Sequence, residues 1–422
     1  MTFQLSNSER LLSIYDPNFV RRVETLNGGA PVQVCLESRM LLDQSGTGVA
    51  TYARVLASCL EGAGAKALIL DDGRQTEQIS RPRFARWLSA ARVAPRAAAV
   101  VSHDDAADPV RWLAPDVFRE AQVFFNIHGR PLPVTFDRTP EVMHWTYPIP
   151  LYVVGAKNLY TIHDLIPITH PDLTPIPGRR HGGILRAIAR QAHGFVTVSE
   201  TMRASVIDHL GVDPRKVTNT YQAIETPLQF DPALPDDLRS GRYFFFCGRV
   251  ERRKNLGRLA RAHAQSGSGL PLVIVGPEVD GEEDVEADLR EFVGVRRMAW
   301  VPRNELIGLM RRARALLFPS LAEGFGLPIA EAMTLGCPVL ASHGGATAEV
   351  AGDAALLADP HDVAAMAREI QRLESDDALC ARLRAAGFNR GKNFTPEIYA
   401  RRLRALYADT LGQGTVNSKV PA

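Results

Sequence analysis

Short uninterrupted runs of apolar residues alternate with stretches of helical spacing over the first half of the chain. A run without polar alternation is typical of a strand that is buried on both faces, as in a parallel sheet. Between the runs, apolar residues recur every three or four positions, most clearly from about Val49 to Leu60, which predicts amphipathic helices. The expected strands cover residues 31–36, 67–70, 123–127, 158–162 and 194–199. This order predicts a parallel sheet with helices on both faces.

A polar, proline-rich stretch over residues 226–241 interrupts the pattern and is interpreted as a linker. The alternation then restarts, with expected strands at 243–247, 272–276, 315–318 and 338–341, and helices from about 256, over 361–386 and over 396–411. The predicted fold class is α/β, with two tandem Rossmann-like, doubly wound domains and a cleft between them. The predicted division is an extension (1–30), a first domain (31–225), the linker (226–241), a second domain (242–395), a C-terminal helix that could return to the first domain (396–411) and a disordered tail (412–422).

The composition is that of a globular protein, and 422 residues indicate two domains of ordinary size. A formal charge of +2 is too small to indicate nucleic-acid binding. No segment approaches the roughly 18 apolar residues of a membrane span, and the N-terminus lacks the apolar run of a signal peptide. The five cysteines are scattered, which is typical of reduced thiols and gives no zinc site. These features predict a cytoplasmic protein.

The segment over residues 318–336 places two glutamates around one helix start. A glycine-bearing loop holding Glu323 follows a strand, and a helix is expected to begin near Pro328 and to end at Gly336. Glu331 would then lie in the first turn of this helix. Because unpaired N–H groups and the positive end of the dipole gather at a helix N-terminus, this place suits an anionic phosphate.

A second group of charged residues follows the expected strand 243–247. Arg249 and Lys254 would lie at the carboxyl end of that strand and at the opening of a helix, where doubly wound folds bind their ligands. A guanidinium and an ammonium together can neutralise a diphosphate. Arg252 and Arg253, by contrast, are expected to form a solvated face.

Three motifs carry a family resemblance: Gly248-Arg249 through Lys254-Asn255, Glu323-Gly324-Phe325-Gly326-Leu327-Pro328, and Glu331-Ala332-Met333. They resemble the retaining, nucleotide-sugar-dependent glycosyltransferases of the GT-B fold, a family 4-like group, over nearly the whole chain from residue 31. Weaker matches lie at 47–49, 161–165, 198–200 and 349–355. The last of these runs and the loop His163-Asp164-Leu165-Ile166-Pro167 resemble the branch of bacterial mannosyltransferases and related enzymes that build surface polysaccharides. One departure is Gly345-Ala346-Thr347-Ala348, where Ser-Leu-Pro is commoner.

The resemblance implies a role for each matched residue. Arg249 and Lys254 would hold the donor diphosphate and stabilise the departing nucleotide diphosphate. Glu331 would accept hydrogen bonds from the ribose hydroxyls, and Glu323 would lie near the donor sugar and favour positive charge at its anomeric carbon. The implied donor site is Gly48, Arg249, Lys254, Glu323, Gly324, Phe325, Gly326, Leu327 and Glu331, with the backbone amides of residues 325–327 capping the phosphates.

Two residues of the first domain complete the implied site. Gly48 would close over the diphosphate, and His163 would face the sugar across the cleft as a catalytic residue. His163 could instead cap a loop, and Ser199 could be only the N-cap of the following helix. Glu349 is left outside the site as a surface residue.

The chain has no Asp-x-Asp pair and no His/Cys cluster, so no metal is implied and no cofactor is expected beyond the nucleotide-diphosphate sugar as co-substrate. Positive charge at the site would then come from Arg249, Lys254 and the helix N-terminus. Glu323 is the obvious candidate nucleophile for a covalent route. The resemblance favours the other route, same-face attack, with the donor phosphate accepting the proton of the acceptor.

The sequence therefore predicts a metal-independent hexosyltransferase in envelope or exopolysaccharide biosynthesis. The first hypothesis for the donor is GDP-mannose, with a UDP- or dTDP-sugar as the alternative. The acceptor is expected to be a carbohydrate or a lipid-linked oligosaccharide. A nucleotide-sugar epimerase and a non-catalytic sugar-binding scaffold remain alternatives.

A basic stretch over residues 81–96 contains no acid and mixes arginines with apolar side chains. A basic amphipathic helix suits the surface of an anionic membrane, here the inner face of the cell membrane. The alternative is an ordinary helix whose apolar side is core. The residues concerned are Arg81, Arg83, Arg86, Arg92 and Arg96, with Phe84, Trp87, Leu88 and Val93.

Overall fold

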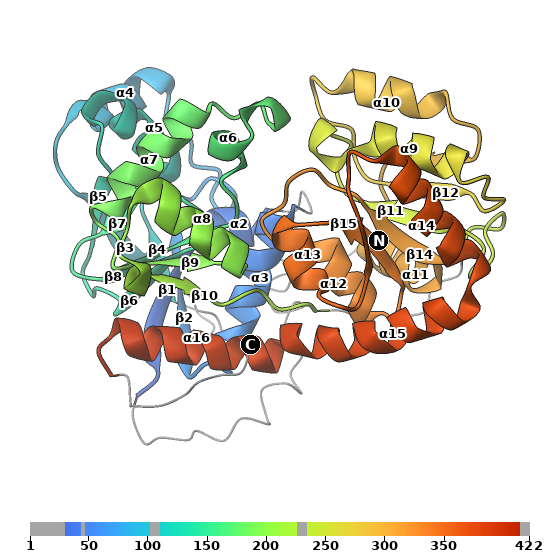
Figure 1. Cartoon of the computed structure of the whole chain (residues 1–422). Coiled ribbons are helices and arrows are strands. Elements are labelled where there is room, and N and C mark those ends of the chain that lie inside the picture. The colour runs from blue at the N-terminus through green and yellow to red at the C-terminus, as the bar shows by residue number, and fades with distance from the viewer. Residues whose placement is uncertain (1–29, 44–46, 102–109, 226–233, 414–422) are drawn as a thin grey trace, which may run out of the picture.

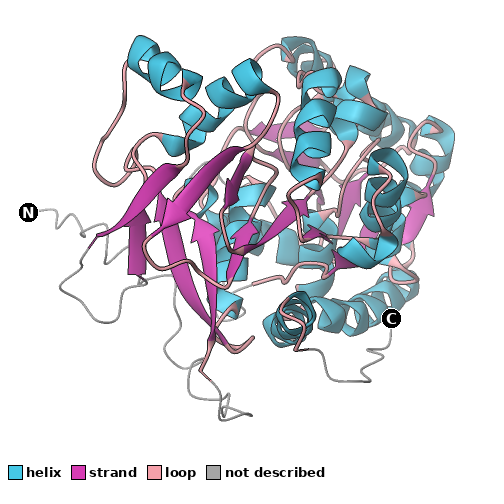
Figure 2. Cartoon of the chain, turned by 90° about the vertical axis from the view of Figure 1, so that its left-hand side faces the viewer, coloured by secondary structure: helices cyan, strands magenta, loops and turns pink. Residues whose placement is uncertain are grey.

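The computed structural model describes residues 30–43, 47–101, 110–225 and 234–413, which form two α/β domains (Figure 1). The described part of the first domain contains a sheet of ten strands in the order β10-β9-β8-β6-β1-β2-β4-β3-β5-β7. The β3–β4 pair is antiparallel and the other neighbours are parallel. The strong twist of this sheet is visible in Figure 2.

The elements of the first domain are as follows. The strands are β1 Val32–Glu37, β2 Ala65–Asp71, β3 Arg96–Val101, β4 Val110–Leu113, β5 Leu132–Phe136, β6 Val142–Trp145, β7 Leu151–Val153, β8 Lys157–Ile162, β9 Gly194–Thr197 and β10 Val217–Asn219. The helices are α2 Ser38–Leu41, α3 Gly48–Cys59, α4 Arg83–Ala91, α5 Val117–His128, α6 Ile166–Thr169, α7 Gly178–Ala189 and α8 Glu200–Leu210, with short 3₁₀ turns η2 Pro171–Leu173 and η3 Pro214–Lys216.

The second domain is built around a parallel sheet of six described strands in the order β13-β12-β11-β14-β15-β16. Its strands are β11 Phe244–Cys247, β12 Leu272–Val275, β13 Val295–Met298, β14 Ala315–Phe318, β15 Val339–Ser342 and β16 Leu356–Ala358. Its helices are α9 Leu256–Gln265, α10 Glu283–Arg290, α11 Arg303–Arg312, α12 Leu327–Thr334, α13 Gly345–Ala351, α14 Val363–Ser375 and α15 Asp377–Gly391, with turns η4 Arg252–Lys254 and η5 Lys392–Phe394. Strand order reverses between β11 and β14, the switch point at which such sheets bind ligands.

β1 shows how the first sheet separates two cores. Its Cys35 belongs to a buried cluster with Phe118 of α5 and Leu185 of α7. Its neighbours Val34 and Leu36 belong to another cluster, which includes α3 and extends into the second domain. Because successive side chains of a strand point to opposite faces, the sheet is covered on both sides.

The last helix, α16 Pro396–Thr410, packs on the first domain, whereas α15 before it packs on the second (Figure 1). Arg404 Nη2 of α16 donates to the carbonyl oxygen of Gly62 at 2.9 Å. The hydroxyl of Tyr407 lies 2.9 Å from Nδ1 of His144 in β6. The chain end thereby links the two domains.

Three expectations need correction. Residues 123–127 belong to α5, where Phe118, Ala121 and Phe124 are buried at helical spacing; a short apolar run cannot by itself distinguish a buried helix face from a strand. Residues 361–386 form parts of two helices, because the extended Asp376 ends α14 and caps α15 by accepting a hydrogen bond from Leu379 N. The first sheet is mixed, since β3 and β4 are antiparallel.

The domain boundaries remain predictions. The predicted extension, part of the linker and most of the tail lie outside the described residues. Among the helices that are described, none is both long and apolar enough to cross a membrane.

Candidate active site

The two charged segments singled out in the sequence meet at the switch point of the second sheet. Residues 248–255 follow β11 and residues 319–326 follow β14, two strands that are parallel neighbours. The carboxyl ends of parallel strands lie at one edge of a sheet, so the two loops emerge side by side. Residues about 70 positions apart in sequence are thereby brought into contact.

Glu323 forms the centre of a buried ionic cluster. Its Oε1 accepts a hydrogen bond from Lys254 Nζ at 2.5 Å, and its Oε2 pairs with Arg253 Nη1 at 2.8 Å. Only 10% of the Lys254 side chain and 11% of the Glu323 side chain are exposed. Arg253 is held further by the carbonyl oxygen of Ala322 at 3.0 Å and by the carboxylate of Glu251 at 2.5 Å.

The cluster keeps Glu323 ionised. Burial alone would raise the pKa of this carboxyl, but the attraction of Arg253 and Lys254 outweighs burial and lowers the pKa to about 2. Burial lowers the pKa of Lys254, and the negative charge of Glu323 opposes that effect. A fixed negative charge thus stands between two cations at the edge of the sheet.

The glycine loop leads into α12 through a left-handed backbone. Gly326 has φ 92° and is the N-cap of α12, which begins at Leu327. Glycine suits this position because other residues rarely adopt positive φ. Glu331 is therefore the fifth residue of the helix, so its predicted place in the first turn is wrong. It is 3% exposed and paired with Arg303, the first residue of α11.

The same loop touches the first domain. Gly324 lies so close to His163 that a Cβ added to it would be 1.6 Å from the His163 carbonyl oxygen. The Ser199 hydroxyl donates to the carbonyl oxygen of Gly324 at 2.8 Å. The glycine loop is consequently a direct contact between the two domains.

Comparison with known proteins decides the family. A family model described as glycosyl transferases group 1 matches residues 237–390. Over 274 residues the chain is 32% identical to O-antigen chain mannosyltransferase B of Escherichia coli, a match that covers 58% of this chain and 71% of that protein. This chain is a group 1 glycosyltransferase.

Other comparisons agree with this assignment. The glycosyltransferase is 24% identical over 337 residues to O-antigen chain mannosyltransferase RfbU of Salmonella typhimurium, across 79% of this chain and 89% of that protein. Sucrose-phosphate synthase from Thermosynechococcus elongatus has a structure that matches with a TM-score of 0.67 at 19% identity, covering 91% of this chain and 100% of that one. The latter likeness confirms the GT-B fold, and the family confirms a retaining hexosyltransferase.

The fold of the glycosyltransferase places most of the predicted donor residues close together. Arg249, however, lies apart from the Glu323 cluster. Its side chain is 52% exposed, and its Nε is 3.9 Å from Glu251. Arg253, expected on a solvated face, is instead 18% exposed and paired with Glu323. Arg252 does lie on the surface, where it pairs with Asp284.

Of the two residues predicted in the first domain, His163 lies at the contact with the glycine loop. His163 Nε2 is 2.7 Å from the carbonyl oxygen of Thr146, and its ring stands edge-on to Tyr52 at 4.7 Å. Burial lowers the pKa of His163, so its imidazole is neutral at physiological pH. A Cβ added to Gly48 would meet no atom of the described chain within 4 Å.

Two features of the glycosyltransferase were not predicted from its sequence. No sequence pattern around Arg303 indicates that it pairs with Glu331, because only the fold brings α11 to that residue. Glu349 is not a simple surface residue: its carboxylate accepts hydrogen bonds from the backbone N–H groups of Glu200 and Thr201 at 2.7 and 2.8 Å. It thus caps α8 of the first domain from α13 of the second. Ser199 is indeed the N-cap of α8, and it also binds Gly324.

Proposed function

We propose that this glycosyltransferase moves a hexose from a nucleotide diphosphate to a carbohydrate or lipid-linked oligosaccharide acceptor, and that the donor is GDP-mannose. The similarity to two O-antigen mannosyltransferases supports mannose and a role in envelope polysaccharide assembly. The observation that carries the donor class is the cluster of Lys254, Arg253 and Glu323 at the switch point, beside the start of α12. Membership in a family of transferases disfavours the epimerase and the scaffold.

The proposed roles of the basic residues follow from their positive charge. Lys254 and Arg253 are close enough to a common point to bind a diphosphate, and Arg249 on the exposed side of the loop would close over it. Their positive charges would stabilise the departing nucleotide diphosphate without having to reorganise during the reaction. Arg253 is added here to the residues that the sequence predicted.

Glu323 is better suited to electrostatic stabilisation than to nucleophilic attack. Its two oxygens are engaged by Lys254 and Arg253, and a carboxyl with a pKa of about 2 is a weak base. A fixed carboxylate near the anomeric carbon would favour the positive charge that develops there as the glycosidic bond to phosphate breaks. This arrangement favours same-face attack over a covalent intermediate.

A panel of donors tests the proposal. GDP-mannose, UDP-glucose and dTDP-glucose would be compared by thermal stabilisation of the protein and then by sugar transfer to a lipid-linked acceptor. GDP-mannose should raise the melting temperature of the protein more than the other two donors, and mannose should be the sugar that is transferred. Consumption of UDP- or dTDP-glucose with GDP-mannose untouched would overturn the donor assignment, and formation of an isomerised nucleotide sugar without acceptor would indicate an epimerase.

Glu331→Ala should raise the donor KM by roughly 10- to 100-fold, the cost of losing a charged hydrogen bond, with kcat little changed. The ribose contact would exist in both ground and transition states, and loss of uniform binding appears in KM. Steady-state kinetics and calorimetry with nucleotide diphosphate measure this. Glu397→Ala, at an exposed position of α16, is the control. An unchanged KM in Glu331→Ala would remove Glu331 from the donor site.

Activity should survive an excess of EDTA, because arginine and lysine side chains are proposed to balance the diphosphate charge. The measurement is the transfer rate before and after chelation, followed by addition of magnesium or manganese. Loss of activity that either metal restores would contradict the proposed electrostatics.

A further inference from the structure

Helix α4 is turned the opposite way from an ordinary surface helix. Its apolar side chains face solvent: Phe84 is 71% exposed, Trp87 52% and Leu88 46%. They occupy positions i, i+3 and i+4, which lie on one side of a helix. Arg86, on the inner side, is buried and pairs with Asp116 at 2.6 Å.

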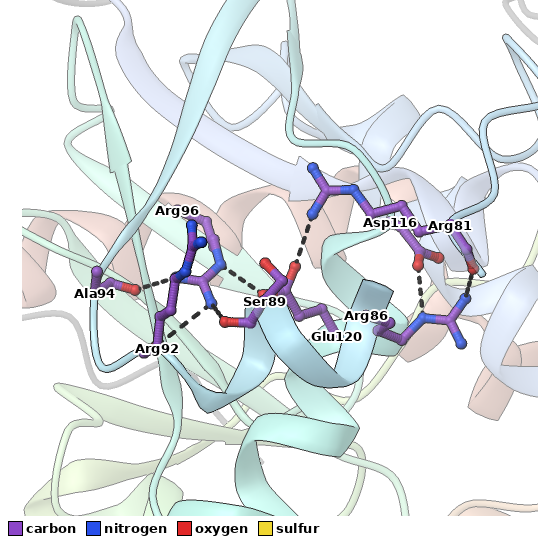
Figure 3. A network of polar contacts seen from close by, with 8 residues as sticks. All are labelled: Arg81, Arg86, Ser89, Arg92, Ala94, Arg96, Asp116 and Glu120. Carbon is purple, nitrogen blue, oxygen red and sulfur yellow. Dashed lines mark hydrogen bonds and ion pairs between the residues drawn. The ribbon is translucent and has the colours of Figure 1, made fainter. Parts of the chain in front are cut away.

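Three of the five arginines in the basic stretch are held within the domain, as Figure 3 shows. Besides Arg86, both Arg81 and Arg96 pair with Glu120, at 3.2 and 2.6 Å. The idea that the whole stretch forms one basic face is therefore corrected. Arg83 and Arg92 are the arginines that are classed as exposed.

The helices beside α4 extend its positive charge. α5 packs against α4, and Arg180 of α7 donates to Gln122 of α5 at 2.8 Å, so α4, α5 and α7 lie in series on the first domain (Figure 1). Within these three described helices the one carboxylate is Glu120, whose side chain is 1% exposed. Their exposed arginines are Arg83, Arg119, Arg179, Arg180 and Arg186. Although the whole chain carries a formal charge of only +2, these helices expose charge of one sign.

We propose that α4 docks the protein on the surface of an anionic lipid bilayer, with Phe84, Trp87 and Leu88 entering the headgroup region and Arg83 and Arg92 contacting lipid phosphates. Two observations favour a bilayer over a protein partner. Aromatic side chains with flanking arginines suit the membrane interface. Exposed charge of one sign suits a surface of opposite charge. A helix of nine residues is too short to span, so it would lie in the plane of the interface. The proposal does not depend on the donor or acceptor proposed above.

Flotation of the full chain with vesicles tests this. The protein should float with vesicles of phosphatidylcholine and phosphatidylglycerol at low salt, remain behind with phosphatidylcholine alone, and dissociate in part at high salt because exposed charges are screened. Arg83→Gln with Arg92→Gln should weaken binding about fivefold for each arginine, as expected for basic side chains near an anionic membrane. Phe84→Ser with Trp87→Ser should also release the protein, even with both arginines intact.

Matched controls come from the second domain. Trp300→Ser removes a tryptophan that is 72% exposed, and Arg368→Gln with Arg382→Gln removes two exposed arginines. These variants should float like the wild type. Thermal melts should show that the α4 variants are folded, and transfer to a water-soluble acceptor should be unchanged in them.

The proposal would be overturned if the wild-type protein did not float with anionic vesicles, or if the Phe84 and Trp87 double variant floated as well as the wild type. Light scattering adds a third decisive result. A wild-type dimer that the same double variant converts to a monomer, without vesicle binding by either protein, would assign α4 to an interface between copies of the chain.

Discussion

Glu323→Gln should lower kcat on the order of 10²-fold or more, the size typical of losing one electrostatic contact in a water-poor site. The carboxyl is ionised at neutral pH, since Arg253 and Lys254 outweigh the effect of burial and lower its pKa to about 2. The substitution therefore removes a full negative charge with little change in shape. The charge would matter most when the anomeric carbon becomes positive, which occurs in the transition state and appears in kcat.

The substitution should not weaken the binding of nucleotide diphosphate. It leaves Lys254 without its anionic partner and Arg253 with Glu251 alone, so both cations become more available to phosphate. Calorimetry with the diphosphate products, alongside steady-state kinetics, measures both effects. Glu369→Gln is the control, because that residue pairs with Arg372 on the surface of α14. If Glu323→Gln loses nucleotide affinity while keeping its turnover, the role assigned to Glu323 is wrong.

Gly324→Ala should reduce kcat/KM by about 10²-fold, because a displacement of roughly 1 Å at an active site can cost that much. The added Cβ would lie 1.6 Å from the carbonyl oxygen of His163 and 2.8 Å from its carbonyl carbon. The obstacle is backbone, so a change of side-chain rotamer cannot relieve it. The glycine loop and the first domain would have to move apart, which would separate the cluster at Glu323 from the residues facing it.

A matched variant isolates this effect. Gly183→Ala lies in α7, and its added Cβ would meet only Phe125 Cζ at 3.9 Å, an ordinary contact, so its activity should match the wild type. Small-angle X-ray scattering should show a more open Gly324→Ala protein. Wild-type kinetics in this variant would show that the closed contact is not needed for transfer.

The strands that the sequence predicts well are those buried on both faces. β11 and β14 are apolar along their length, β15 is apolar up to its last residue, Ser342, and all three are buried throughout, so an apolar run is enough to locate each of them. The expected strands around them match within one or two residues. β13, in contrast, is only partly buried, and two arginines occupy its centre, so no apolar run marks it. β3 does carry a run of apolar residues, but most of them are not buried.

The sequence by itself determined which residues lie in the motifs, and through them the family and the fold. The spacing of glycines and charged residues around strand ends is a local property, so it can be read directly from the sequence. Gly324, Glu323 and Lys254 could therefore be named before the structure was known. The start of α12, expected near Pro328, lies one residue earlier, at Leu327, and that helix start puts Glu331 at the fifth residue, beyond the first turn.

Tertiary structure decided which distant side chains meet. Arg253 reaches Glu323 across 70 positions, and Glu349 reaches the start of α8 across nearly 150. These pairings arise because parallel strands bring their carboxyl ends to one edge and because the two domains touch, neither of which is encoded in local spacing. The orientation of α4 was decided in the same way: an amphipathic pattern predicts two faces but does not say which is inward. The buried carboxylate of Asp116 holds Arg86 inward, and Phe84, Trp87 and Leu88 are left in solvent.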